Sequence, residues 1–264
     1  TGVQTCALPI CSVDSKRVTS IPASDFSSAR RLGTMLHWIT ASGAVAGLIA
    51  LHRILDGQVR QGLLWLIACQ ILDGIDGPLA RKIDVQTHAP KFDGHILDLV
   101  VDYVTCVVVP VILMLSVRLV DSSLAMPLAG MVLLTSALWF ARVDQETPDH
   151  WFNGFPAAWN IVIPTLMILH SSSRVTSLVL VAFSALQLGG IKFPHLMRVT
   201  ALRKVTSTFA LLYLACFVLL SADYPNGPDW ARWVLAVVPI YLGLLVAWRT
   251  WFPQVAIAGQ RVTE

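Results

Sequence analysis

Residues 72–102 read LDGIDGPLARKIDVQTHAPKFDGHILDLVVD, and they place Asp73, Asp76, Asp98 and Asp102 among side chains apolar enough to lie in a membrane. Carboxylates in such surroundings repel one another and lose their hydration, so they require a positive partner. At about 100° per residue, Asp73 and Asp76 share one helix face, and Asp98 and Asp102 lie one turn apart on the next helix. Two carboxylate-bearing faces are therefore expected to meet around cations.

The residue types around these aspartates favour hard divalent cations and a phosphate-bearing ligand. Oxygen-only ligands suit Mg²⁺ or Mn²⁺, and the sequence offers no Cys or His cluster for zinc. Gly77, Ala80 and Gly94 place small side chains on the same two faces, where a ligand can approach the backbone. Arg81 adds a guanidinium fork for phosphate. Together they predict a metal-bound diphosphate substrate.

The same residues carry a family resemblance. Residues 73–102 follow the pattern Asp, two residues, Asp-Gly, two residues, Ala-Arg, a spacer, Gly, three residues, Asp, three residues, Asp. This pattern resembles the signature of the CDP-alcohol phosphatidyltransferase superfamily. Every fixed position is matched, by Asp73, Asp76, Gly77, Ala80, Arg81, Gly94, Asp98 and Asp102.

The spacer narrows the resemblance within the superfamily. It runs from Lys82 to Asp93 and has twelve residues, more than most members have. This length is similar to that of the bacterial phosphatidylcholine synthases, as are the stretches FNGFPAAWN at 152–160 and KFPHLMRVTALR at 192–203. The resemblance covers most of the chain from about Arg30 onward.

The resemblance implies a reaction and a set of roles. The choline hydroxyl would attack the β-phosphate of CDP-diacylglycerol and release CMP, with two divalent cations, Mn²⁺ or Mg²⁺, in the site. The implied metal ligands are Asp73, Asp76, Asp98 and Asp102, of which Asp102 is also the implied catalytic base. The implied CDP-binding residues are Asp73, Gly77, Ala80, Arg81 and Gly94.

Choline and the lipid phosphate need further residues. A quaternary ammonium has no N–H donor, so its recognition requires aromatic faces, and a buried amide requires a partner. The candidates for choline are Tyr103, Asn153, Phe155, Trp159 and Asn160. The candidates for the lipid phosphate are Arg198, Arg203 and Lys204, whose charge is explained equally well by a cytoplasmic location.

Composition sets the fold class. The chain is 55% hydrophobic and 13% charged, with a mean hydropathy of +0.67, which excludes an ordinary soluble domain. A formal charge of +3 does not suggest nucleic acid as a partner. We expect an all-α polytopic membrane bundle with about eight transmembrane helices. The predicted spans are 34–53, 61–81, 94–117, 124–141, 155–171, 175–190, 205–222 and 232–252.

The chain divides into four parts. Residues 1–10 resemble a translated sequencing adapter rather than native protein and are not expected to contribute to the fold. Residues 11–33 are expected to form a cytoplasmic N-terminal tail or interfacial segment, 34–252 the transmembrane domain and 253–264 a cytoplasmic C-terminal tail. Gly43 and Gly47 favour close helix packing in the first span.

Basic residues predict the orientation. With both termini inside, fourteen of the 19 Lys and Arg residues lie on the cytoplasmic side. The aspartates are then at the cytoplasmic ends of their spans, and the subfamily resemblance implies a bacterial inner membrane. The five basic residues left outside are Arg53, Arg60, Arg118, Arg174 and Arg232.

Three alternatives stay open. The aspartates could form salt bridges with Arg81 and Lys82 instead of binding metal. An enzyme of the same class could use serine or glycerol 3-phosphate as its acceptor. A divalent-cation transporter would also carry intramembrane acids, but it predicts acids spread across the membrane depth. Membrane lipids are expected neighbours, and a homodimer is compatible with the sequence.

Overall fold

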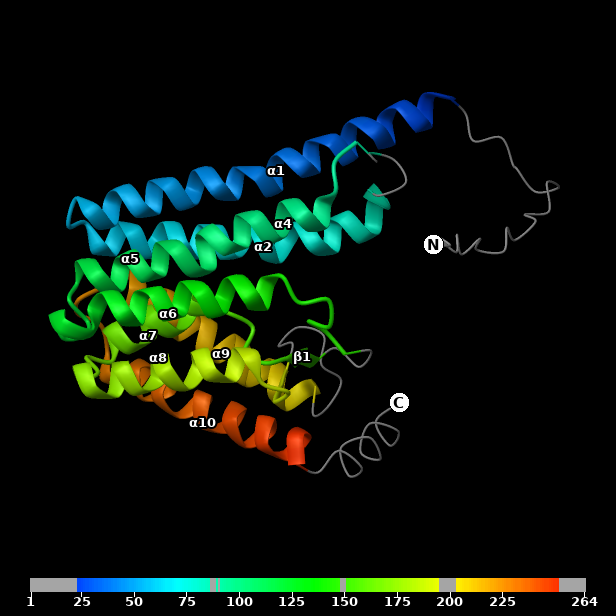
Figure 1. The fold of residues 1–264 in the computed structure, drawn as a ribbon. Helices are drawn as coiled ribbons and strands as arrows, with labels where there is room; N and C mark the ends of the chain where they lie inside the picture. The colour runs from blue at the N-terminus through cyan, green and yellow to red at the C-terminus, as the bar shows by residue number, and fades with distance from the viewer. Residues whose placement is uncertain (1–22, 86–88, 90, 148–150, 195–202, 252–264) are drawn as a thin grey trace, which may run out of the picture.

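The computed structural model describes residues 23–85, 89, 91–147, 151–194 and 203–251, and these form a bundle of helices with one small sheet (Figure 1). The bounds of the elements are α1 (Ala23–Leu55), α2 (Val59–Ile83), α4 (Gly94–Asp102), the π-helix η1 (Tyr103–Val108), α5 (Val109–Ser116), α6 (Ser122–Phe140), β1 (Trp151–Asn153), α7 (Trp159–Ile168), α8 (Ser173–Leu188), β2 (Lys192–Pro194), α9 (Arg203–Ala222) and α10 (Asp229–Trp251).

The described helices agree with an all-α membrane protein. Because α4, η1 and α5 follow one another without a break, the described part of the chain forms eight helical segments, and each overlaps one predicted span. Six are long and apolar enough to cross a membrane by length and composition. The first of them, α1, already begins at Ala23, before the predicted start of the first span.

Two of the eight segments, α7 and α8, are shorter than a full span, with 10 and 16 residues. The predicted span 155–171 is shortened at both ends by the backbone, since Ala157 and His170 have φ of 53° and 51°. A positive φ interrupts a right-handed helix. We therefore correct this span to the single short helix α7, Trp159–Ile168.

The helices form two groups in the bundle. In Figure 1, α1, α2, α4 and α5 lie together above α6–α10, and the strand β1 lies at one end of the bundle. We call this end the strand end. Helix α1 begins there, α2 runs back to it and α4 leaves from it, so the segment 72–102 turns around at the strand end.

Glycines bring α1 close to the helix that begins with α4. A Cβ on Gly43 would be 2.8 Å from Cγ1 of Val101, and a Cβ on Gly47 would be 3.0 Å from Cγ2 of Thr105. Positions four apart on α1 therefore meet positions four apart on the partner helix, and the two helices run parallel. The close helix packing predicted from these two glycines is confirmed.

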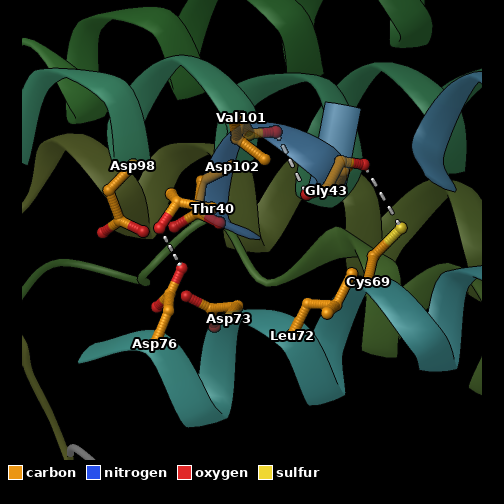
Figure 2. Close-up of a pocket in the computed structure, with 10 residues that line it drawn as sticks. Thr40, Gly43, Cys69, Leu72, Asp73, Asp76, Asp98, Val101 and Asp102 are labelled. Atoms are coloured by element: carbon orange, nitrogen blue, oxygen red, sulfur yellow. Dashed lines mark hydrogen bonds between the residues drawn. The ribbon is translucent and has the colours of Figure 1, made fainter. Parts of the chain in front are cut away.

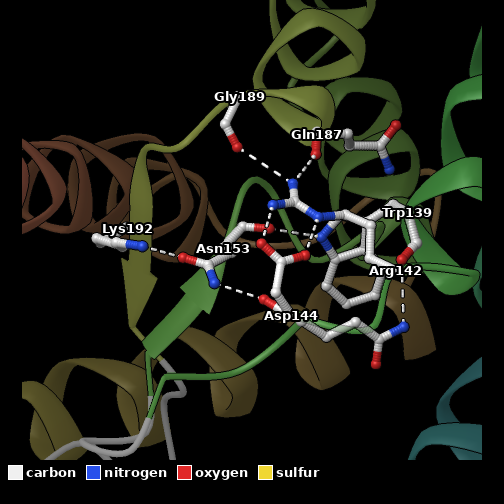
Figure 3. Close-up of polar contacts among 8 residues, drawn as sticks. Trp139, Arg142, Asp144, Asn153, Gln187, Gly189 and Lys192 are labelled. Atoms are coloured by element: carbon white, nitrogen blue, oxygen red, sulfur yellow. Dashed lines mark hydrogen bonds and ion pairs between the residues drawn. The ribbon is translucent and has the colours of Figure 1, made fainter.

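A polar network links α6, α8 and the strand β1 at the strand end (Figure 3). The Arg142 guanidinium pairs with Asp144 at 2.8 Å and donates to the carbonyl oxygens of Gln187 and Gly189 at 3.1 and 3.2 Å. It thereby satisfies carbonyl groups at the end of α8, which have no partner within their own helix. The hydrogen bond from Arg142 lowers the pKa of the Asp144 carboxyl below its ordinary value, so the pair stays charged.

A substitution of Gly154 tests the close packing of this residue against the end of α8. Its φ is 83°, its N–H donates to the Ile191 carbonyl at 2.8 Å, and a Cβ would collide with the Gln187 carbonyl oxygen. We expect Gly154→Ala to destabilise the fold by about 1–3 kcal/mol through backbone strain, measured as a lower thermal midpoint in detergent. Gly130→Ala is the control, because nothing lies within 4 Å of its Cβ position. Equal midpoints for the two variants would contradict the packing described here.

Candidate functional site

The structure brings all four aspartates of the segment 72–102 to one pocket between α1, α2 and α4 (Figure 2). Asp73 and Asp76 lie near the end of α2, and Asp98 and Asp102 lie one turn apart on α4. One carboxylate oxygen from each of Asp73, Asp98 and Asp102 lies within 4.8 Å of the other two. The fourth, Asp76, lines the same pocket.

Asp76 is held from the first helix. The Thr40 hydroxyl donates to Oδ2 of Asp76 at 2.6 Å, and only 6% of Asp76 is exposed. A hydrogen bond of this kind fixes the rotamer of a carboxylate and leaves its other oxygen for a ligand. Three helices, rather than the two predicted, therefore build the pocket.

The donor set fits a hard divalent cation. Ligand oxygens around an octahedral Mg²⁺ lie roughly 3–4 Å apart, so carboxylates within 4.8 Å of one another need little adjustment to bind it. The rest of the pocket lining, among the described residues, is uncharged: Thr40, Gly43, Cys69, Leu72, Val101 and Thr105.

The geometry disfavours the two alternatives to a metal site, which are internal salt bridges and a cation-transport path. Within the described ranges, none of the four aspartates forms an ion pair, although the side chains of Arg81 and Lys82 are described and exposed. The acids also occupy about one turn of each helix rather than a line across the bundle. This arrangement disfavours both internal salt bridges and a transport path.

Small residues and one arginine lie beside the aspartates. Nη1 of Arg81 is 3.5 Å from where a Cβ of Gly77 would be, so the guanidinium lies over the glycine one turn earlier on α2. Ala80, between them, is half-buried. Gly94 is the first residue of α4, and its missing Cβ leaves room for the ring of His37, whose Cε1 is 3.1 Å from that position.

The predicted choline residues are mostly engaged inside the protein. Phe155 and Trp159 are 5% and 0% exposed, and their rings pack edge to face with centroids 5.2 Å apart. The indole N–H of Trp159 donates to Ser136 at 2.9 Å. The amide of Asn153 donates to the Asp144 carbonyl and accepts from Lys192 (Figure 3).

Two of the predicted choline residues differ from these three. Tyr103, directly after Asp102, is only partly buried, and its hydroxyl donates to the Leu133 carbonyl at 3.1 Å. Asn160 is 5% exposed, and its Oδ1 has no hydrogen-bond partner among the described residues. Of the predicted lipid-phosphate residues, Arg198 lies outside the described ranges, and Arg203 and Lys204 open α9.

Sequence reasoning missed two features of the site. The first is Thr40, a hydroxyl inside an apolar span, whose position three residues before Gly43 was a usable signal. The second is the π-helix η1, which begins immediately after Asp102. A π-helical turn is wider than an α-helical turn and often marks functional sites, and Pro110 just beyond it lacks the N–H that an α-helix would use.

Comparison with known proteins establishes the class. The family model for CDP-alcohol phosphatidyltransferase matches residues 34–247, which include all four aspartates and every helix from α2 through α9. The chain belongs to this family. Members of the family generally depend on divalent cations, and the aspartate pocket is the candidate site for them.

Curated relatives narrow the comparison. The chain is 31% identical to the phosphatidylcholine synthase of Brucella melitensis over 238 residues, which is 90% of this chain and 83% of the relative. It is 34% identical to that of Pseudomonas aeruginosa, covering 82% of this chain and 87% of the relative. It is 32% identical to that of Legionella pneumophila, covering 83% and 88%.

The hydrogen bond to Asp76 can be tested directly. Thr40→Val keeps the shape of the side chain but removes its donor, so Asp76 loses its fixed orientation. We expect the affinity for Mn²⁺, titrated in detergent by calorimetry, to fall about 10–100-fold. Thr34→Val on the same helix is the control, since the Thr34 hydroxyl bonds to the Arg30 carbonyl at 2.9 Å and to no other described residue. Unchanged affinity in Thr40→Val would show that Thr40 does not position the site.

Proposed function

We propose that this chain transfers the phosphatidyl group of CDP-diacylglycerol to the hydroxyl of choline and releases CMP. The observation that carries the proposal is the pocket in which three carboxylate oxygens lie within 4.8 Å of one another, in a chain of the CDP-alcohol phosphatidyltransferase family. Relatives named phosphatidylcholine synthase, aligned over most of their length, support choline as the acceptor.

The roles of the acidic residues follow from the donor set. Asp73, Asp76, Asp98 and Asp102 would hold two Mg²⁺ or Mn²⁺ ions. Ions held there would neutralise the diphosphate and the charge that develops on the leaving phosphate. Thr40 keeps the Asp76 carboxylate in place for this role.

Asp102 is the proposed general base. It accepts the proton of the choline hydroxyl as the hydroxyl oxygen bonds to the β-phosphorus, the one that bears diacylglycerol. The bond from that phosphorus to the bridging oxygen breaks, and CMP leaves with the electron pair. A base positioned beside the hydroxyl supplies both proton transfer and orientation.

The nucleotide half of the substrate would lie over the small residues. Gly77, Ala80 and Gly94 allow it to approach the helix backbones, and Arg81 over Gly77 can pair with phosphate. Asp73 is the remaining residue of the proposed CDP-binding group. Arg203, Lys204 and Arg198 stay the candidates for the anionic lipid phosphate.

The relatives named phosphatidylcholine synthase favour choline over serine and glycerol 3-phosphate. The four acids of the pocket do not decide the acceptor, because the two cations proposed there would offset their charge. Tyr103 is only partly buried, and the Asn160 amide oxygen has no hydrogen-bond partner among the described residues, so these two stay the leading choline candidates. Asn153, Phe155 and Trp159 would support the site from inside the core.

We place the enzyme in a bacterial inner membrane with the strand end in the cytoplasm. The excess of basic residues predicted for that side supports this orientation. CMP could then leave directly into water. A homodimer is compatible with this placement.

The acceptor is tested by CMP release from the purified protein in detergent with CDP-diacylglycerol and Mn²⁺. We expect release with choline and not with serine, glycerol 3-phosphate or inositol. Asp102→Asn should lower the rate by at least about 100-fold. Asp56→Asn is the control and should leave the rate unchanged, because Asp56 lies in the loop after α1, where it pairs with His52. Release with another alcohol alone would replace choline as the acceptor.

Metal removal gives a separate prediction. Chelation with EDTA should abolish CMP release because the uncompensated carboxylates repel the diphosphate. Added Mn²⁺ or Mg²⁺ should restore the rate, while Ca²⁺, which is larger and prefers more ligands, should restore less. Full activity in EDTA would refute a metal-dependent transfer.

A further inference from the structure

A buried histidine lies one helical turn before Thr40, which lines the pocket. His37 on α1 is 7% exposed, and its Nε2 has no hydrogen-bond partner among the described residues. Burying such a nitrogen costs its full desolvation free energy unless a partner arrives. Neither the proposed chemistry nor the family resemblance assigns a role to His37.

The ring of His37 is held on two sides. Its centroid is 5.8 Å from that of Phe92, with an interplanar angle of 68°. Its Cε1 and Nδ1 are 3.1 and 3.5 Å from the position that a Cβ on Gly94 would occupy, so any larger residue at 94 would displace the ring. These contacts orient the imidazole but do not satisfy Nε2.

The position of His37 relative to the aspartates defines what could reach it. His37 and Thr40 are three residues apart on one face of α1, a separation of about 4.5 Å along the axis. Gly94 and Asp98 are likewise one turn apart on α4. Thr40, Asp76 and Asp98 therefore form an inner layer, and His37 and Gly94 form an outer layer one turn nearer the strand end.

Only one part of the substrate suits the outer layer. With the diphosphate at the aspartates and the acyl chains in the bilayer, the cytidine must extend from the inner layer toward the strand end. Choline offers methyl groups and a hydroxyl consumed at the phosphorus, so it has nothing further for an imidazole. Cytidine carries ribose hydroxyls and a base carbonyl and amine, all of which hydrogen-bond to imidazole.

We infer that His37 is a substrate-binding residue whose Nε2 hydrogen-bonds to the cytidine of the CDP-linked lipid. The inference rests on the proposed function for the identity of the nucleotide. Gly94 contributes to this arrangement by letting the ring lie against α4.

Variants of His37 separate this role from packing. His37→Phe keeps an aromatic ring against Phe92 and Gly94 but removes Nε2. His37→Gln brings an amide close to the place of Nε2 and should rescue part of the effect. His95→Gln is the matched control, because His95 is exposed on α4 next to Gly94.

The readouts are the Kd for CMP, measured by calorimetry with Mn²⁺ present, and the KM values for CDP-diacylglycerol and choline. For His37→Phe we expect the Kd for CMP and the KM for CDP-diacylglycerol to rise about 5–10-fold, the loss of one hydrogen bond. The KM for choline and the thermal midpoint should match those of His95→Gln. A changed midpoint with unchanged Kd for CMP would overturn the inference and make His37 a packing residue.

The CMP measurement also separates the two proposals. CMP binding needs no acceptor alcohol, so a weakened Kd in His37→Phe supports the inference even if the acceptor is serine rather than choline. Conversely, choline-dependent CMP release with equal Kd values in wild type and His37→Phe refutes the role of His37 and leaves the proposed function intact.

Discussion

Mutual repulsion of four carboxylates around one pocket between apolar helices is the constraint on which this structure depends. Three of them have oxygens within 4.8 Å of one another, and the fourth is buried and fixed by Thr40. Positive charge among its members would relieve this repulsion, and the described lining supplies none. The proposed cations would complete the site, and the bundle supplies the rigidity that holds the acids together.

That rigidity comes from close helix packing in the first half of the chain. Gly43 and Gly47 bring α1 against the helix that carries Asp98 and Asp102, so that Thr40 can reach Asp76 on α2. In the second half, Arg142 joins the ends of α6 and α8, and the buried ring of Trp159 bonds to α6 through Ser136. The site is held by the first group of helices, and the second group supports it.

Much of this was readable from the sequence, because it depends on local spacing. Hydropathy predicted all eight helical segments, and a 100° periodicity placed the acids of each helix on one face. What the sequence could not supply was contact between distant positions. Thr40 and Asp76 are 36 residues apart, and nothing in either position alone reveals the bond between them.

The lack of information on distant contacts also explains why the bounds of α7 and the choline candidates were predicted less well. Ala157 before α7 and His170 after it adopt positive φ, which non-glycine residues rarely do, so these two residue types did not reveal the shortened helix. Phe155 and Trp159 were candidates for a choline cage by residue type, but the structure buries both rings against each other. Aromatic composition alone does not distinguish a ligand cage from a core, since both use the same side chains.

The most direct test of the account is to locate Mn²⁺ by anomalous diffraction from crystals of the protein grown with the ion. We predict two anomalous peaks in the pocket between α1, α2 and α4, each about 2.2 Å from aspartate oxygens. In Asp98→Asn the peaks should weaken or vanish. A pocket without Mn²⁺ in the wild-type crystals, or Mn²⁺ bound only elsewhere, would contradict the claim that the four aspartates form a metal centre.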